Sequence, residues 1–515
     1  MFRRLIPLAA FACLCASAGA LSAQEPQLGS VTFPTSGSAA AQERFVEGVL
    51  WLHSFEYESA AEAFREAQQI EPDFAMAYWG EAMTHNHSLW QQRDRDAAVA
   101  VLERLATTPE ARRAKATTER EKMFLDAVEA LWAEGPKAER DTAYYYAMQE
   151  LAKAHSDDPE AQAFYALSIL GLSQAVRVFP SYMRAAAIAD ELLRLNPDHP
   201  GAAHYLIHSV DDPIHAPLGL HAARAYSKIA PDAAHAQHMT THIFVALGMW
   251  DDVVSQNIVA AGLTGWWPGH YTAWLEYGYA QQGRSDTARA HLERAWRNLG
   301  DSPSTGRRAY LSSMRAHYLV NTRRWADPVI EWEIDLSGAS AVAKAKDAFA
   351  LGYAAFEQGD REAAANHLAM LSELTGSNDV DWYGGNRTVP AILEAELAAL
   401  MLLADSAADE ALALMSEATA LEDAMPMEYG PPDVVKPSHE LLGEMLAALG
   451  RPAEAQAEFE RALALAPNRA LSLAGLSRAA MVAGDENTAA RAHSALREVW
   501  HSADAGVPAL VESAQ

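Results

Sequence analysis

The sequence has 515 residues, half of them hydrophobic, and its 68 acidic against 40 basic side chains give a formal net charge of −28. A surface this acidic favours solubility and repels phosphate backbones, so we expect no nucleic-acid partner. The two cysteines, Cys13 and Cys15, both lie near the start, which excludes disulfides and thiolate metal sites from the rest of the chain.

Residues 1–23 have the pattern of a secretory signal peptide. Arg3 and Arg4 precede an apolar run that is too short to span a bilayer, and small residues follow it. Leu14 directly before Cys15 disfavours a lipid anchor, so we expect soluble export to a periplasmic or secreted location. Residues 24–40 are small and polar and predict a flexible lead-in. No later segment has the ~18 uninterrupted apolar residues of a transmembrane helix.

Two distant segments share five residue types at identical separations of 12, 4, 3 and 5 positions. They are Gly48, Ala60, Phe64, Ala67 and Pro72, and Gly443, Ala455, Phe459, Ala462 and Pro467. This spacing resembles the tetratricopeptide repeat, a helix-turn-helix unit of about 34 residues. Small residues are needed where two helices cross closely, the phenylalanine fills the space between units, and proline ends the second helix.

Fainter copies of this pattern fill most of the chain, and no strand-like alternation persists. The resemblance therefore implies an all-α, right-handed superhelical solenoid of eleven or twelve helix pairs. We expect N-terminal repeats at 41–91, irregular helical pairs at 92–158, repeats with a histidine-rich groove at 159–300, degenerate repeats at 301–423 and C-terminal repeats at 424–515.

Aromatic and histidine side chains gather in the first repeats. In the family's repeat, Trp79 and Met83 match positions of the first helix that line the concave ligand groove, and His53 and His87 match its end. They would form an aromatic wall or a pocket entrance. The alternative is that the aromatic residues are core and the histidines cap a helix end.

The densest pattern is a histidine cluster, because eight of the 19 histidines lie within residues 199–242. His204 and His208 are four residues apart and share one helix face. His238 and His242 repeat the pair 34 residues later. Equivalent positions on successive repeats lie side by side in a solenoid, so the four imidazoles should form a ladder across two neighbouring helices.

Such a double pair predicts a metal site. Two imidazoles at i and i+4 can chelate one divalent ion, and Asp211 or Asp212 would complete the shell. Nitrogen and oxygen donors of this kind suit zinc, copper, iron or nickel better than calcium or magnesium. The alternatives are buried histidines that only satisfy hydrogen bonds, and a duplicated repeat. Further candidate ligands or supporting residues are His215, His221 and His235.

Two other places are candidates for the concave face. His317 matches a groove position of a later repeat, and Glu440 and Glu444 match groove positions of the well-marked C-terminal repeat. The two carboxylates would bind a basic peptide group or add ligands from the far rim. The alternative is a rigid connector with a solvated acidic face.

Several strings resemble a group of large, exported bacterial tetratricopeptide-repeat proteins of poorly defined activity. The strings are Leu52–Tyr57, Tyr78–Met83, His204–His208, Asp211–Pro213 and Lys436–Glu444. This resemblance implies a cell-envelope or secreted setting and carries no established reaction. The sequence has no phosphate-binding loop or dinucleotide fingerprint, so we expect no nucleotide cofactor.

Two functional hypotheses follow. The first is an exported scaffold whose concave groove, with a histidine and aspartate metal site, binds a peptide, a protein or a small ligand. The second is a metal-dependent hydrolase or oxidase that uses the same cluster, with metal-bound water as nucleophile and a free aspartate as base.

Overall fold

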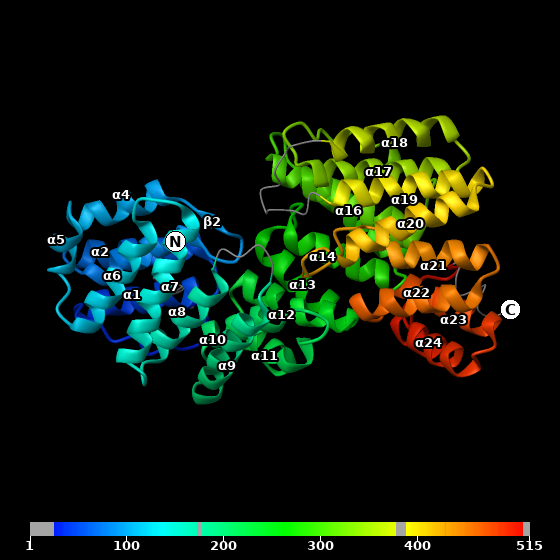
Figure 1. Ribbon diagram of the computed structural model, residues 1–515. Helices are drawn as coiled ribbons and strands as arrows, with labels where there is room; N and C mark the ends of the chain where they lie inside the picture. Colours follow the sequence, from blue (N-terminus) through cyan, green and yellow to red (C-terminus); the bar gives the residue numbers. More distant parts are fainter. Residues whose placement is uncertain (1–24, 173–176, 377–387, 428, 508–515) are drawn as a thin grey trace, which may run out of the picture.

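The computed structural model describes residues 25–172, 177–376, 388–427 and 429–507. The expected signal peptide and both cysteines lie outside these residues. The described chain is built almost entirely of antiparallel helix pairs in a superhelical arrangement (Figure 1), which confirms the predicted all-α solenoid. Its described helices, 24 α-helices and one 3-10 helix, agree with the expected eleven or twelve pairs.

The N-terminal half holds the described strands, a two-residue antiparallel hairpin. Its elements are α1 (Ala39–His53), α2 (Tyr57–Ile70), α3 (Ala75–Met83), β1 (Asn86–His87), β2 (Gln92–Arg93), α4 (Arg95–Leu105), α5 (Pro109–Arg113), α6 (Glu119–Trp132), α7 (Lys137–Ala154), α8 (Pro159–Leu170), α9 (Phe179–Leu195), α10 (Pro200–Val210), α11 (Ala216–Ile229) and α12 (Ala234–Ala246).

The C-terminal half continues the same alternation, interrupted by the 3-10 helix η1. Its elements are α13 (Trp250–Thr264), α14 (His270–Gln281), α15 (Ser285–Arg297), α16 (Thr305–Thr322), η1 (Pro328–Glu331), α17 (Ala341–Glu357), α18 (Arg361–Thr375), α19 (Thr388–Ala404), α20 (Ala408–Asp423), α21 (Ser438–Ala448), α22 (Pro452–Leu465), α23 (Ala470–Ala483) and α24 (Glu486–Val499).

The two marked repeats show why the repeat needs glycine and phenylalanine. The Phe64 ring of α2 lies between Gly48 of α1 and Gly80 of α3, where an added Cβ would come within 2.7 and 2.3 Å of the ring. Phe459 of α22 lies in the same way between Gly443 and Gly475. A side chain on either glycine would push the helices apart, so these residues fix the stacking of successive units.

The residues expected as a flexible lead-in lie extended against the first repeats. Leu28 and Phe33 are buried, and the backbone N–H of Ser30 donates to the Asp198 carbonyl oxygen at 2.9 Å. Phe33 packs edge-on against Phe45 and Trp79. Two apolar residues are therefore enough to attach a segment whose composition is otherwise polar and small.

The superhelix turns back on itself, so that the last repeats contact the middle of the chain. The Trp250 indole donates to the Asn468 carbonyl oxygen at 2.9 Å, and the Trp500 indole donates to the Gln281 carbonyl oxygen at 3.0 Å. These contacts join α13 and α14 to α23 and α24. Among the described helices, none is long and apolar enough to cross a membrane.

Candidate metal centre

Six histidine side chains from three consecutive first helices of repeats meet at the centre of the molecule. Helix α10 supplies two of them, α12 supplies three, and the N-terminus of α14 supplies the last. They are His204, His208, His235, His238, His242 and His270. The predicted ladder of two histidine pairs is thus present, and the repeat stacking of α10 on α12 creates it.

Five of these rings form a closed circle. The centroid of His204 lies 4.9 Å from that of His208 and 5.1 Å from that of His235. On the opposite side, His242 lies 5.2 Å from His208 and 5.1 Å from His238. His238 and His235, at 6.2 Å, close the circle. The imidazoles therefore surround a common space instead of extending along a surface.

The outer nitrogens of these rings are bound to oxygen atoms of the protein. His204 donates its Nδ1–H to the backbone carbonyl of His53 at 2.6 Å. His238 donates its Nδ1–H to Oδ1 of Asn257 at 2.8 Å, and the Asn257 amide group in turn donates to the Val253 carbonyl oxygen. A neutral imidazole that donates through Nδ1 keeps a lone pair on Nε2, so both rings present a ligating nitrogen to the interior.

Asp211 orients two more rings. Its Oδ2 accepts from Nδ1 of His208 at 3.2 Å and from Nδ1 of His242 at 3.0 Å, and Arg177 pairs with its Oδ1. Burial favours the neutral carboxyl, but Arg177 and the two histidines hold the pKa of Asp211 below its ordinary value. The sequence suggested Asp211 as a ligand. In the structure its carboxylate lies on the outer, Nδ1 side of the rings, where partners of metal-bound histidines are found.

The inner nitrogens lack such partners. Nε2 of His204, of His208 and of His235 is buried with no hydrogen-bond partner, which is costly for a polar atom. Nε2 of His238 faces Nε2 of His242 at 3.3 Å. Since both of those rings donate through Nδ1, two lone pairs face each other. An ion with nitrogen ligands at about 2.05 Å in tetrahedral geometry separates them by about 3.3 Å, so the spacing suits two ligands of one metal.

Burial keeps these rings neutral. It lowers the pKa of His208 to about 4, and it lowers the pKa of His270 to about 3, in each case assisted by neighbouring His242. The pKa values of His204, His235 and His238 are also depressed, first by burial and then by other histidines. Neutral imidazole is the form that binds metal, so the set is ready to ligate near neutral pH.

Aromatic side chains enclose the six histidines. Trp274 stacks on His242 with centroids 4.6 Å apart, and Tyr429 lies at the same distance from that ring. Trp90, from the hairpin segment, lies 5.6 Å from His235. Segments from the N-terminal repeats, the middle and the 429–437 connector therefore all contribute to one enclosure, and the returning superhelix brings them together.

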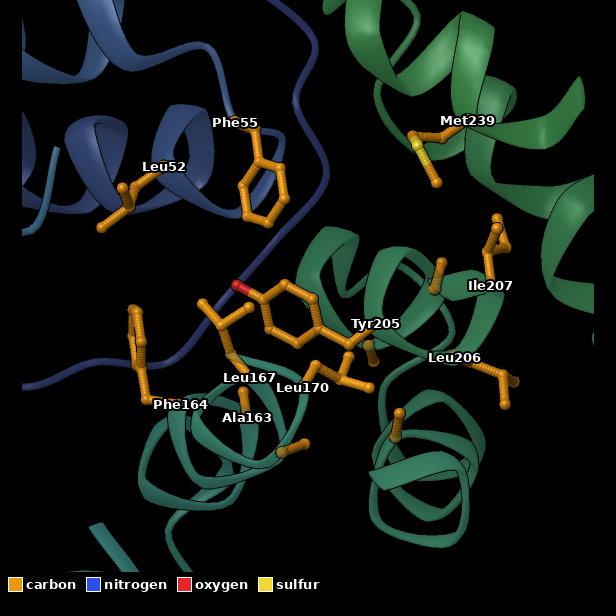
Figure 2. Packing of buried hydrophobic residues seen from close by; sticks show 14 of the residues in the cluster. Leu52, Phe55, Ala163, Phe164, Leu167, Leu170, Tyr205, Leu206, Ile207 and Met239 are labelled. Carbon is orange, nitrogen blue, oxygen red and sulfur yellow. The ribbon is translucent and has the colours of Figure 1, made fainter. Parts of the chain in front are cut away.

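Phe55 contributes to this enclosure at the expense of backbone strain. Its φ of 56° is in the left-handed region, which bulky residues rarely adopt. This conformation places its ring 4.3 Å from His204 and 5.6 Å from His235. Figure 2 shows Phe55 facing Tyr205 of α10, with Leu167 and Leu170 of α8 on the other side of that tyrosine. The strained turn after α1 thus packs directly on the histidine cluster.

The remaining candidates of this region have other partners. Asp212 accepts from the backbone N–H groups of Ile214 and His215 and from the His215 ring, so it stabilises the turn before α11 and does not face the cluster. His221 forms an exposed pair with Asp190. Neither predicted role as a ligand is realised by these contacts, because both side chains are engaged outside the circle of rings.

His53 belongs to a second buried group. Its Nδ1 pairs with the Tyr205 hydroxyl and its Nε2 pairs with Oε2 of Glu160, both at 2.8 Å. Oε1 of Glu160 lies 3.3 Å from His199. Burial raises the pKa of Glu160, but the two histidines outweigh it and hold the value at about 2. The nitrogens of His53 are thus already used, and its backbone carbonyl serves the metal candidate through His204.

The aromatic residues of the first repeats were expected in a groove, and the structure corrects this. Trp79 and Met83 are fully buried, with Trp79 against Phe124 and Phe164. Helix α3 is covered on all sides by neighbouring helices, so its groove positions become core. His87 stacks on Tyr57 at 4.0 Å beside the enclosure and makes no contact with the circle of rings that would make it a ligand.

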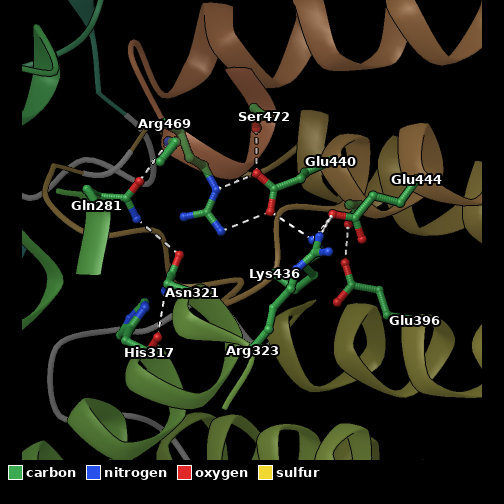
Figure 3. A network of polar contacts seen from close by, with 12 residues as sticks. Gln281, His317, Asn321, Arg323, Glu396, Lys436, Glu440, Glu444, Arg469 and Ser472 are labelled. Atoms are coloured by element: carbon green, nitrogen blue, oxygen red, sulfur yellow. Dashed lines mark hydrogen bonds and ion pairs between the residues drawn. The ribbon is translucent and has the colours of Figure 1, made fainter. Parts of the chain in front are cut away.

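Glu440 and Glu444 lie in an internal ionic network (Figure 3). Glu440 is fully buried and accepts from Lys436 at 2.9 Å, from Arg469 at 2.8 Å and from Ser472. Glu444 pairs with Lys436 and Arg323. Because bound cations already neutralise both carboxylates, this region is a rigid connector, the alternative that the sequence left open.

His317 lies at the edge of the same network. It is buried against Tyr277, and its Nδ1 has no hydrogen-bond partner. Burial lowers its pKa, and the positive charges of Lys346 and Arg469 lower it further. No second imidazole or carboxylate joins it among the groups of the described residues that suit a metal, so His317 carries no site of its own.

His270 was missing from the predicted ligands. It is the first residue of α14, 32 residues after His238, and its centroid lies 4.4 Å from that ring. The 34-residue register places no histidine there, because the turn after α13 changes the offset of the next repeat. A search for histidines at the start of each first helix would have found it.

Comparison with known proteins identifies the repeat and little more. A family model described as a tetratricopeptide repeat matches residues 437–469. Solved structures with the same general architecture include the human IFIT1 dimer with m7Gppp-AAAA, at 13% identity, TM-score 0.37 and coverage of 90% of this chain and 91% of that one. The APC/C hetero-tetramer Cut9-Hcn1 matches at 13% identity and TM-score 0.35, covering 87% and 78%.

No curated protein sequence matches this chain. TM-scores below 0.5 describe too loose a superposition to carry a ligand or a partner from those structures to this chain. The histidine cluster must therefore be interpreted from its own geometry.

Proposed function

We propose that this chain is a tetratricopeptide-repeat binding scaffold that holds a transition metal in its histidine cluster. One observation carries the proposal: the outer nitrogens are bound to oxygen atoms, while the inner nitrogens are buried, unprotonated and without partners. A cluster that only satisfied hydrogen bonds would pair both nitrogens of each ring, as His53 does. Ions such as zinc, copper, iron and nickel suit imidazole donors.

The enzymatic alternative, a metal-dependent hydrolase or oxidase, gains less support. Hydrolysis at a metal needs a base next to the bound water. Of the two aspartates considered for that role, Asp211 is engaged by Arg177 and two histidines, and Asp212 is engaged by the turn before α11. The geometry favours a metal-binding scaffold over a hydrolase.

The setting and the partner complete the proposal. The apolar N-terminal run supports export to the periplasm or the outside of the cell, and the repeat fold supports binding of a protein or peptide. We expect no nucleic-acid ligand, because the net charge is −28. Cell fractionation with an antibody to the mature chain tests the export.

Elemental analysis of the protein, purified without a histidine tag, tests the metal site. We expect a transition metal at a fixed ratio in the wild type and none in His204→Ala/His238→Ala, which removes one ring from each pair. His291→Ala is the matched control, because His291 is also buried but bonds only to the Thr272 carbonyl and lies outside the cluster. No metal in the wild type after reloading would sink the proposal.

A further inference from the structure

The six histidines divide into two groups of three. In each group, one ring nitrogen per residue lies within 4.8 Å of the other two, as three ligands of one ion require. The first group is His204, His208 and His235, and the second is His238, His242 and His270. We infer that the cluster holds a pair of metal ions, one in each three-imidazole group. This inference rests on the proposed function and specifies how many ions the site takes, and of what kind.

The helix geometry keeps the two groups separate but adjacent. Helix α10 supplies two ligands of the first group, α14 supplies one of the second, and α12 supplies ligands to both. His235 lies one turn before the others on α12 and so turns toward α10, whereas His238 and His242 turn toward α14. A single ion would have to choose between these groups, since each of them already offers a complete set of three nitrogens.

Asp211 links the two groups. The same Oδ2 atom accepts from His208 of the first group and from His242 of the second, and the two ring centroids are 5.2 Å apart. One carboxylate thereby fixes the orientation of one ligand to each ion. An orienting acceptor shared in this way places the two ions on either side of a common pair of rings.

Charge indicates which ions fit. The six candidate donors are neutral imidazoles, and the charge of Asp211 is balanced by Arg177. Two divalent ions would add four positive charges to a buried and electrically neutral site, which is very costly. Two cuprous ions add only two, and copper is among the ions that imidazole suits. The site is therefore assigned to a pair of copper ions in the monovalent state.

The enclosure agrees with this assignment. Trp274, Tyr429 and Phe55 pack on the rings at centroid distances of 4.6, 4.6 and 4.3 Å. An aromatic shell of this kind keeps water and other oxygen ligands away from the ions. Low coordination by three nitrogens is then stable, and this suits a monovalent ion better than a divalent one that requires further ligands.

Anaerobic titration of the metal-free mature protein with copper(I), against a chromogenic copper(I) chelator, tests the inference. We expect two equivalents in the wild type, one in His235→Phe, one in His270→Phe and none in the double variant. These two residues are chosen because their other nitrogens make only long contacts, at 3.5 and 3.4 Å, so the near-isosteric ring removes a ligand and little else. His291→Phe should keep two equivalents.

The outcomes separate the inference from the proposed function. One equivalent in the wild type, or an unchanged value in both single variants, would overturn the pair and leave a single metal site standing. A parallel titration with zinc(II) should fill the second half at least tenfold more weakly than the first. Two equally tight zinc ions would overturn the charge argument, and no binding of either metal would overturn the pair and the metal scaffold together.

Discussion

The molecule contains two large buried polar clusters that are built in opposite ways. The network around Glu440 and Arg469 is fully charged, and each oxygen of Glu440 is bound by a cation or a hydroxyl. The histidine cluster is neutral on its inner side and leaves several nitrogens without partners. Both are equally inaccessible to water, so burial alone does not reveal which of them has a function.

The difference teaches how to separate structural from ligand-binding polar groups. A complete network has nothing left to offer, because its donors and acceptors match within the chain. An incomplete network with fixed outer contacts and free inner lone pairs is stable only if something fills it. The four predictions below test this contrast, from the largest expected effect to the smallest.

Breaking the complete network should have the largest effect. Arg469→Met leaves the buried carboxylate of Glu440 short of its main cation, and we expect a loss of about 3–5 kcal/mol in the free energy of unfolding. Chemical denaturation monitored by circular dichroism measures it. The double variant Glu440→Gln/Arg469→Met should recover part of the loss. Equal stability of Arg469→Met and the wild type would show that this network is not structural.

Acid should weaken the metal-free histidine cluster before it affects the carboxylate network. His208 has a folded pKa of about 4 against an ordinary 6.5, so between these values the unfolded chain binds a proton that the folded chain does not. Stability is therefore complete above pH 6.5 and falls as the pH drops towards 4, by about 3 kcal/mol for this group.

The same experiment contains its control. The folded pKa of Glu440 is lowered below its ordinary 4.5, because Arg469 and Lys436 outweigh burial, so its contribution is lost only below pH 4.5. Denaturation midpoints at pH 7 and pH 5 should therefore differ in the wild type and differ less in His208→Phe. A flat profile over this range would contradict the neutral, buried state of the rings.

Removing the shared orienting carboxylate should weaken metal binding without abolishing it. Asp211→Asn keeps the size of the side chain but loses the charge that holds the His208 and His242 rings, and loss of such a partner costs about 10–100-fold in metal affinity. Competition with a chelator of known affinity measures the change. Asp212→Asn is the matched control, because Asp212 caps a turn, and an equal loss there would indicate a general structural effect.

The smallest effect is expected outside both clusters. His221→Ala removes an exposed ion pair with Asp190, and such pairs contribute at most about 1 kcal/mol. Metal content should stay at the wild-type ratio. A loss of metal in this variant would mean that the site extends to the surface of α11 and that the six-histidine assignment is wrong.

Most of the fold and a good part of the candidate site followed from local pattern. The spacing of Gly48 and Phe64 predicted the stacking that the structure shows, because helix crossing requires a small residue opposite a large one. The separations of 4 and 34 residues placed His204, His208, His238 and His242 together, since repeats stack in register. These are properties of one repeat and its neighbour.

What the sequence could not provide depends on contacts between distant segments. The His53 carbonyl, Arg177, Tyr429 and Phe55 reach the cluster from outside α10 and α12, and His270 departs from the repeat register. The roles of Asp211 and Glu440 were decided in the same way, by the partners that the folded chain brings to them.

The sequence by itself thus determined that this protein is a helical repeat solenoid with histidines in phase on successive helices, because helix periodicity and repeat length are local properties. The tertiary structure alone decided which nitrogen of each ring faces inward, which carboxylate orients and which is neutralised, and that aromatic side chains enclose the cluster. Those features depend on desolvation and on hydrogen-bond partners that lie far away along the chain, and only the returning superhelix brings them together.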